Sequence, residues 1–297
     1  MRLKTLQLID FRNYTGNPFD FDEGVNVVFG ANASGKTNLL EAVYLLGTGN
    51  SFKAKVTDEM VRFGQELGRV MGMVGDEKDL EVVVTRGIVA GQITLKRKYL
   101  VDGAPKRKSD YAGLLPVVIF RPEDMDMLTG GPDMRRNFMD AILSQASEAY
   151  DKSLSTYTAA LRRRNKLLDA IREGVASRHS LTFWDGLLIK HGEVVSSHRG
   201  TLIDYINSLW GRSELFNKLN LVYDKSIISQ SRLEQYKDEE LAAGFTLVGP
   251  HKDDFICGLS AKDLGTYGSR GEQRMAVLAM KLGEIYFNEE KINDRPL

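Results

Sequence analysis

One stretch decides the fold: Val25-Asn26-Val27-Val28-Phe29-Gly30-Ala31-Asn32-Ala33-Ser34-Gly35-Lys36-Thr37-Asn38-Leu39-Leu40-Glu41-Ala42. An apolar run rich in valine precedes the first glycine and favours a buried strand at 25–29. The apolar residues after Thr37 continue with helical spacing to about residue 46. A strand, a glycine loop and a helix in this order form the context of a phosphate-binding P-loop. The spacing Gly30-x4-Gly35-Lys36-Thr37 therefore predicts a nucleotide-binding site.

The chemistry of such a loop follows from its backbone. Glycine reaches dihedrals that a Cβ would block, so successive N–H groups can turn toward one anion at a helix N-terminus. Lys36 is placed to reach the β- and γ-phosphates of ATP, and the Thr37 hydroxyl to bind Mg²⁺. The expected ATP-binding residues of the loop are Gly30, Ala31, Asn32, Ala33, Ser34, Gly35, Lys36, Thr37 and Asn38. The alternative is a plain glycine turn between a strand and a helix. The four specified positions should match by chance in only on the order of 1% of chains of this length.

Composition limits the class of protein. The 297 residues are 42% hydrophobic, so the chain can bury a large core. Lys plus Arg equal Asp plus Glu at 40 each, so local patches must carry any nucleic-acid contact. The single Cys257 excludes a disulfide framework and suits a reducing compartment. The sequence has neither a signal-peptide pattern nor an apolar run near 18 residues, so we expect a cytoplasmic protein without a membrane span.

The remaining pattern predicts an α/β fold. Alternation favours strands at 2–10 and in an antiparallel meander over 67–101, and the apolar run 116–120 predicts a central strand. Residues 150–210 favour two helices, the second with an apolar seam from Leu181 to Leu209. Strand patterns return at 245–248 and 253–257. We therefore expect an ATPase head at 1–148 and 244–297, with an antiparallel β lobe, interrupted by an inserted helical domain at 149–243.

A second glycine motif lies near the other end of the chain. Ser269-x-Gly271-x-Gln273 immediately precedes an apolar helical pattern. A serine hydroxyl, a glycine backbone and a helix N-terminus can together bind an anion. Alone, the motif is as consistent with an ordinary helix cap. Combined with the P-loop, it suggests that two chains arranged head to tail could enclose ATP between them.

The motifs together resemble the ABC ATPases of the branch that includes the SMC, Rad50 and RecF families, and the RecF family above all. The resemblance spans nearly the whole chain in family order. Its residues are Ile9 to Tyr14, Gly30 to Ala42, Phe120 to Asp124, Gly130-Gly131-Pro132 with Arg135-Arg136, Val248 to Asp254 and Gly268 to Arg274.

This resemblance implies an ATP-dependent homodimer that binds gapped DNA at single-strand/double-strand junctions. It also implies that the protein acts with RecO and RecR proteins in recombinational repair, replication restart and the SOS response. In these processes the family helps to load recombinase. By the same resemblance, Arg12 lies near the nucleotide, and Ser269, Gly271 and Gln273 meet the ATP of the partner subunit. The family pattern continues into a Walker B strand with paired carboxylates, whereas this sequence ends at Leu297. We therefore expect a truncated chain without catalytic carboxylates that hydrolyses ATP poorly.

Weaker signals leave alternatives open. The basic clusters Lys96-Arg97-Lys98, Lys106-Arg107-Lys108 and Arg162-Arg163-Arg164 with Lys166 could be solvated faces or could contact the DNA backbone. We favour the first two clusters for DNA. His191 and His198 fit helix packing better than a metal pair, since seven residues separate them by about 10 Å along a helix. His251 beside Asp253 and Asp254 favours a turn that supports the head, with a role near the nucleotide as the alternative. The alternative functions are an ABC transporter ATPase subunit and a DNA clamp that binds ATP without hydrolysing it.

Overall fold

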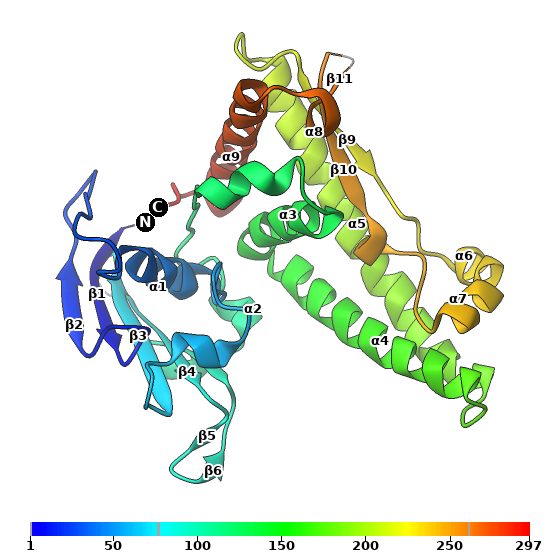
Figure 1. The fold of residues 1–297 in the computed structure, drawn as a ribbon, viewed down its shortest axis with the longest axis horizontal. Helices are drawn as coiled ribbons and strands as arrows, with labels where there is room; N and C mark the ends of the chain where they lie inside the picture. Colours follow the sequence, from blue (N-terminus) through cyan, green and yellow to red (C-terminus); the bar gives the residue numbers. More distant parts are fainter. Residues whose placement is uncertain (1, 76–77, 261) are drawn as a thin grey trace. The chain divides into compact units, whose positions relative to one another are not determined.

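The computed structural model describes residues 2–75, 78–260 and 262–297. The chain divides into two compact units (Figure 1). The first comprises Met1–Ile119 with Asn288–Leu297, and the second Phe120–Phe287. These bounds differ from those of the expected head and helical insertion, and that assignment stays a prediction.

A six-stranded antiparallel sheet forms the framework of the first unit, in the order β2-β1-β3-β4-β7-β8. Its members are β1 (Leu3–Ile9), β2 (Asn17–Asp20), β3 (Leu67–Val74), β4 (Lys78–Thr85), β7 (Arg97–Val101) and β8 (Ala104–Lys106). Short β5 (Ile88–Val89) and β6 (Gln92–Ile93) form a separate hairpin. The expected strand near the N-terminus and the antiparallel meander are therefore confirmed.

The sheet buries one face because its apolar residues alternate. Leu8 of β1 lies opposite Val70 of β3, and Val70 lies opposite Val82 of β4. All three side chains are fully buried, in one core with Leu45 and Leu46 of helix α1 (Lys36–Thr48). Two short helical segments, η1 (Thr57–Met60) and α2 (Lys108–Tyr111), complete this unit. The helix that follows the glycine loop is thereby fixed against the sheet.

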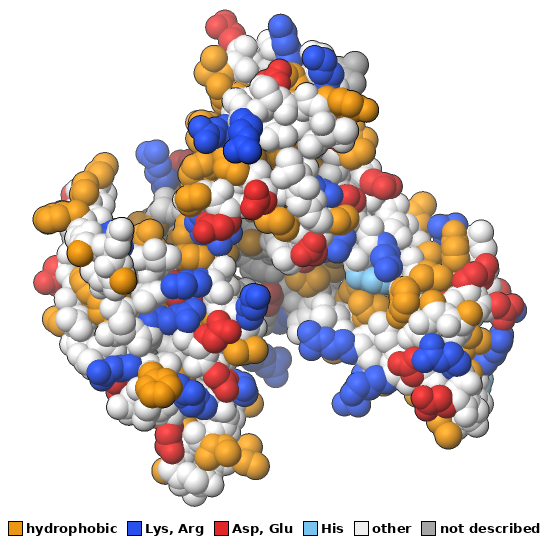
Figure 2. Space-filling view, viewed as in Figure 1, with side chains coloured by type: hydrophobic (Ala, Val, Ile, Leu, Met, Phe, Trp, Pro, Cys, Tyr) orange, Lys and Arg blue, Asp and Glu red, His pale blue; other side chains and the backbone are white. Residues whose placement is uncertain are grey.

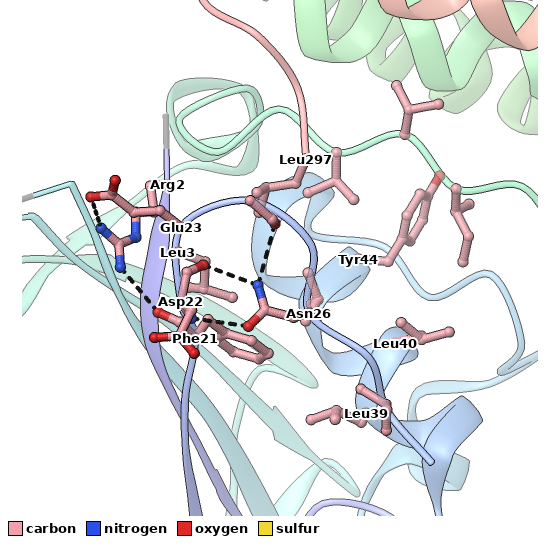
Figure 3. Close-up of a pocket in the computed structure, with 16 residues that line it drawn as sticks. Arg2, Leu3, Phe21, Asp22, Glu23, Asn26, Leu39, Leu40, Tyr44 and Leu297 are labelled. Carbon is pink, nitrogen blue, oxygen red and sulfur yellow. Dashed lines mark hydrogen bonds and ion pairs between the residues drawn. The ribbon is translucent and has the colours of Figure 1, made fainter.

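The predicted strands at 25–29 and 116–120 are wrong, since neither segment is a strand. Val25 and Phe29 are each 90% exposed, and no backbone hydrogen bond joins residues 25–29 to a neighbouring strand in the described chain. The second segment bonds to Leu297: Leu297 N–H donates to the Pro116 carbonyl, and Val118 N–H to the Leu297 carbonyl, both at 2.9 Å. Both segments line an apolar groove of about 450 Å³ against α1 (Figure 3). An apolar run predicts burial, but it does not show whether a neighbouring strand is available for pairing.

The second unit is mainly helical. Its long helices are α3 (Pro132–Ala146), α4 (Glu148–Arg172), α5 (Thr182–Gly211) and α9 (Arg270–Ile292), the last extending beyond the unit. Shorter elements are η2 (Pro122–Met127), η3 (Arg178–Leu181), α6 (Gln230–Gln235), α7 (Lys237–Ala243), η4 (Pro250–Lys252) and α8 (Leu264–Tyr267). A three-stranded antiparallel sheet in the order β11-β10-β9 joins β9 (Leu219–Asp224), β10 (Asp254–Leu259) and β11 (Lys262–Asp263). The expected strand at 245–248 is absent from this sheet.

The predicted pair of long helices is present as α4 and α5, which pack side by side (Figure 1). Leu188, Val195 and Leu202 of the predicted seam are fully buried. Between Val195 and Leu202 the sequence predicts that His198 is buried. In the structure the next residue, Arg199, is buried instead, and His198 is only partly buried. His198 nevertheless packs against the ring of Tyr150, as expected for a packing role.

Candidate nucleotide-binding site

The glycine loop adopts backbone conformations that depend on its sequence. Gly35, which immediately precedes α1, has φ +107°, Gly30 has φ +155° and Ala33 has φ +64°. The loop from Gly30 to Ser34 is exposed. Lys36 Nζ donates to the Gly30 and Ala31 carbonyls, both at 2.8 Å. The ammonium therefore lies against a loop that ends at a helix N-terminus, where backbone N–H groups and the helix dipole favour an anion.

Residues after β1 support this loop from behind. Asn13 Nδ2 donates to the Ser34 carbonyl at 3.2 Å, and the Tyr14 hydroxyl donates to the Gly35 carbonyl at 3.1 Å. Asn38 Nδ2 donates to Asn13 Oδ1 at 2.8 Å. A Cβ on Gly35 would lie 2.6 Å from Asn13 Nδ2 and 3.0 Å from the Tyr14 hydroxyl. Gly35 is thus required both by its backbone angle and by this close approach.

Arg12 is held by its own chain. Its Nε and Nη2 donate to the two carboxylate oxygens of Glu41 at 2.8 and 2.7 Å, and Nη1 donates to the Glu59 carbonyl at 2.6 Å. Glu41 is fully buried in α1 and also accepts a bond from the Ser51 hydroxyl. Arg12 therefore links the end of β1 to the helix that carries the P-loop. Its expected proximity to nucleotide stays a prediction.

A pocket of about 520 Å³ adjoins the loop; it is lined by Asn38 of the loop and by Asn13, which supports the loop. Phe63, 95% exposed, supplies an aromatic face to this pocket. The other lining residues are Arg12, Lys53, Asp58, Glu59, Val61 and Arg86. Sequence patterns did not identify this pocket, because its residues come from four separate segments of the chain.

The second glycine motif is exposed at the two residues predicted to meet a partner subunit. Ser269 and Gly271 are exposed, and a Cβ on Gly271 would meet nothing within 4 Å. Ser269 N–H and Oγ each donate to Glu272 Oε2 at 2.8 Å, and Glu272 N–H donates back to Ser269 Oγ at 3.3 Å. These hydrogen bonds lower the pKa of the Glu272 carboxyl. Gln273 Nε2 instead donates to the Leu264 carbonyl of its own chain.

Some residues of the basic clusters bond within the chain, and others are exposed. Lys96 pairs with Asp58 at 2.6 Å, and Arg97 donates to Gly49, Asn50 and Thr57. Lys98, Lys106 and Arg107 are exposed, while Lys108 is partly buried. Their contact with DNA stays a prediction.

His251 bonds to two other segments of the chain. Nδ1 accepts from the Tyr157 hydroxyl at 2.7 Å and Nε2 donates to the Thr246 carbonyl at 2.9 Å, since a carbonyl can only accept. Burial lowers the pKa of His251 to about 4. Asp253 is fully buried and accepts from Arg199 Nη1 at 3.0 Å. Within the described residues, no group of three His, Cys, Asp or Glu side chains could hold a metal ion.

No helix in the described part of the chain combines the length and the apolar character that a membrane span requires.

Similarity to known proteins covers nearly all of the chain. Residues 2–293 match the RecF/RecN/SMC N-terminal domain family. The DNA replication and repair protein RecF of Agathobacter rectalis is 32% identical over 314 residues, which cover 100% of this chain and 83% of that protein. The protein of the same description from Herpetosiphon aurantiacus is 34% identical, over 100% of this chain and 84% of its own length.

Solved structures agree with this assignment. The recombination mediator protein RecF of the RecFOR pathway, solved as RecF-ATPrS, matches with a TM-score of 0.89 and 31% identity, over 99% of this chain and 83% of its own. The RecF-ATP structure matches with a TM-score of 0.88. The fold is thus the P-loop ATPase head with an antiparallel β lobe and helical subdomain that the sequence predicted. The chain belongs to the RecF/RecN/SMC N-terminal domain family, within its RecF branch.

Proposed function

We propose that this chain is an ATP-dependent DNA-binding protein that acts as a recombination mediator in DNA replication and repair. The observation that carries the proposal is the P-loop: the left-handed backbone of Gly35 and the Lys36 ammonium against the Gly30 carbonyl support phosphate binding here. RecF proteins and the RecF-ATP structures, similar over almost the whole chain, support the same function. The ABC transporter alternative is not favoured, since the relatives named above are repair proteins.

The nucleotide binds with its phosphates on residues 30–38. The Thr37 hydroxyl, exposed in the first turn of α1, holds Mg²⁺. The nucleoside end lies in the adjoining pocket, where Phe63 offers a face for stacking on the base. Arg12 fixes α1 through Glu41 and, because it lines this pocket, lies near the bound nucleotide.

ATP joins two copies of the chain. Ser269 and Gly271 of one copy close over the γ-phosphate bound to the P-loop of the other, and Gln273 supports the turn from within its own chain. The exposure of Ser269 and Gly271 supports this proposal, because a buried serine could not meet a second subunit. The ATPase head at 1–148 and 244–297 forms the dimer, with the helical insertion at 149–243 outside it.

The dimer binds DNA at gaps, where single and double strands meet, and works with RecO and RecR proteins to load recombinase. Within the strand clusters, Lys98, Lys106 and Arg107 are the cations available to the DNA backbone, since Lys96 and Arg97 bond within the chain.

Binding to gapped DNA tests the proposal directly. We expect ATP with Mg²⁺ to tighten binding of gapped DNA by the unchanged chain at least tenfold relative to ADP. Lys36→Ala should abolish this ATP effect but retain weak binding without nucleotide, because the variant lacks the cation that faces the phosphates. Equal affinity with ATP and ADP, or an ATP effect that survives in the variant, would refute the proposal.

A further inference from the structure

Helix α4 presents a basic stripe on its outer face. Between residues 152 and 166, most of its exposed positions recur every three or four residues, which places them on one side of a helix of 3.6 residues per turn. In this part of α4 the exposed residues are Lys152, Ser155, Ala159, Arg162, Arg163 and Lys166. The stripe spans about 21 Å at 1.5 Å per residue. Figure 2 shows Lys and Arg side chains along the edge of the molecule where α4 runs.

The run of three arginines in this helix divides between core and surface. The Arg164 side chain is only 3% exposed and pairs with Asp185 at 2.6 Å and Glu240 at 2.7 Å. Arg162, Arg163 and Lys166 are exposed and form no ion pair with any residue that the structure describes. The sequence alone could not separate these residues, because only tertiary contacts show which cation is already neutralised.

Among the described residues, no acidic side chain pairs with Arg162, Arg163 or Lys166. The nearest acidic residue before its arginines, Asp151, is buried, and Asp169 after them pairs with Arg172 at 2.7 Å. Lys152 pairs with Glu148 at the start of the helix. Three uncompensated cations within five residues therefore stand out in a chain whose formal net charge is zero. A surface of this kind binds a polyanion, because neutralising phosphates releases their condensed counterions.

The other residues of the stripe indicate which polyanion fits. Ser155 and Ala159 are small, so a phosphate backbone can lie close to the helix. None of the six exposed positions is aromatic, and non-specific binding of single strands usually relies on aromatic stacking platforms. We propose that the outer face of α4 contacts the phosphate backbone of duplex DNA, without reading base sequence. This proposal rests on the proposed function and assigns the duplex part of gapped DNA to a surface on the helical unit.

Salt dependence tests the proposal. In the full chain, Arg162→Gln, Arg163→Gln and Lys166→Gln are combined, and duplex DNA binding is measured between 50 and 200 mM salt with ATP and Mg²⁺. Loss of three phosphate contacts should reduce the log–log salt slope by about 2.7. Raising the salt fourfold weakens DNA binding of both proteins. With three fewer phosphate contacts, the variant's loss of affinity should be about 40-fold smaller than that of the unchanged chain. Its thermal stability and ATP affinity should not change.

A matched control removes the same charge elsewhere in the second unit. Arg212→Gln, Lys218→Gln and Lys225→Gln change exposed cations that form no ion pair with described residues. The slope should then stay within experimental error of the unchanged chain. Equal slopes for the α4 variant and the unchanged chain, or an equal loss in the control, would overturn the α4 proposal while leaving ATP-dependent DNA binding intact. An unchanged chain that binds no DNA would overturn both.

Discussion

At the residue scale, Gly35 connects backbone geometry to nucleotide affinity. Its φ of +107° disfavours any side chain, and an added Cβ would lie 2.6 Å from Asn13 Nδ2. Gly35→Ala should displace the loop at a cost of about 1–3 kcal/mol and weaken ATP binding at least tenfold. The control is Gly174→Ala, where φ is also positive, +77°, but nothing lies within 4 Å. Titration with a fluorescent ATP analogue distinguishes them, and unchanged affinity in Gly35→Ala would contradict the assigned role of this glycine.

Glu272 occupies the donors that a partner's ATP would use. Its carboxylate accepts from both N–H and Oγ of Ser269, and a γ-phosphate arriving there would meet a like charge. Glu272→Gln keeps an oxygen for the cap but removes the charge. Removing this repulsion favours a phosphate at Ser269, because like charges repel. ATP-dependent dimers should therefore tighten in sedimentation equilibrium, and a looser dimer would argue against phosphate binding at Ser269.

At the element scale, Tyr157 of α4 is tied through His251 to Thr246, which lies in the segment between α7 and β10. Burial lowers the pKa of His251 to about 4, below its ordinary 6.5. A histidine with a lowered folded-state pKa stabilises the fold above the unfolded pKa, and this stability is lost as pH falls from about 6.5 to about 4. The loss amounts to about 3 kcal/mol. Urea unfolding of His251→Gln should show a flatter pH dependence in this window, and identical profiles would contradict the buried neutral ring.

The elements that sequence patterns predicted correctly are those with a regular period. In β3 and β4, the alternation of apolar and polar residues shows which face of the strand is buried. In α5, apolar residues at helical spacing indicate the buried side of the helix. The runs 25–29 and 116–120 have no alternation, so their apolar character could not show whether a neighbouring strand pairs with them. The partly shifted burial in α5, with Arg199 inside, depends on acidic partners on other elements.

The candidate site was predictable to the same extent. The spacing of Gly30, Gly35 and Lys36 identifies the loop because the backbone itself makes the site. The support from Asn13, the capture of Arg12 by Glu41 and the pocket at Phe63 join residues more than 20 positions apart. Such contacts require the register of the sheet, which a single sequence does not define.

At the scale of the whole molecule, each chain carries two parts of a nucleotide site. The P-loop lies in the first unit, and the exposed Ser269 and Gly271 lie in the second. We propose that neither part completes a site alone, and that ATP closes the pair only when a second copy is present. Function would then depend on chain concentration as well as on ATP.

Mixing two inactive variants tests this claim most directly. Lys36→Ala removes the phosphate-binding cation, and Ser269→Arg blocks the surface that faces a partner. Sedimentation velocity with ATP and Mg²⁺ should show monomers for each variant alone. An equal mixture should form dimers, because one composite site joins an intact P-loop to an intact Ser269 surface. A mixture that stays monomeric while the unchanged chain dimerises, or Ser269→Arg chains that dimerise unaided, would contradict the account.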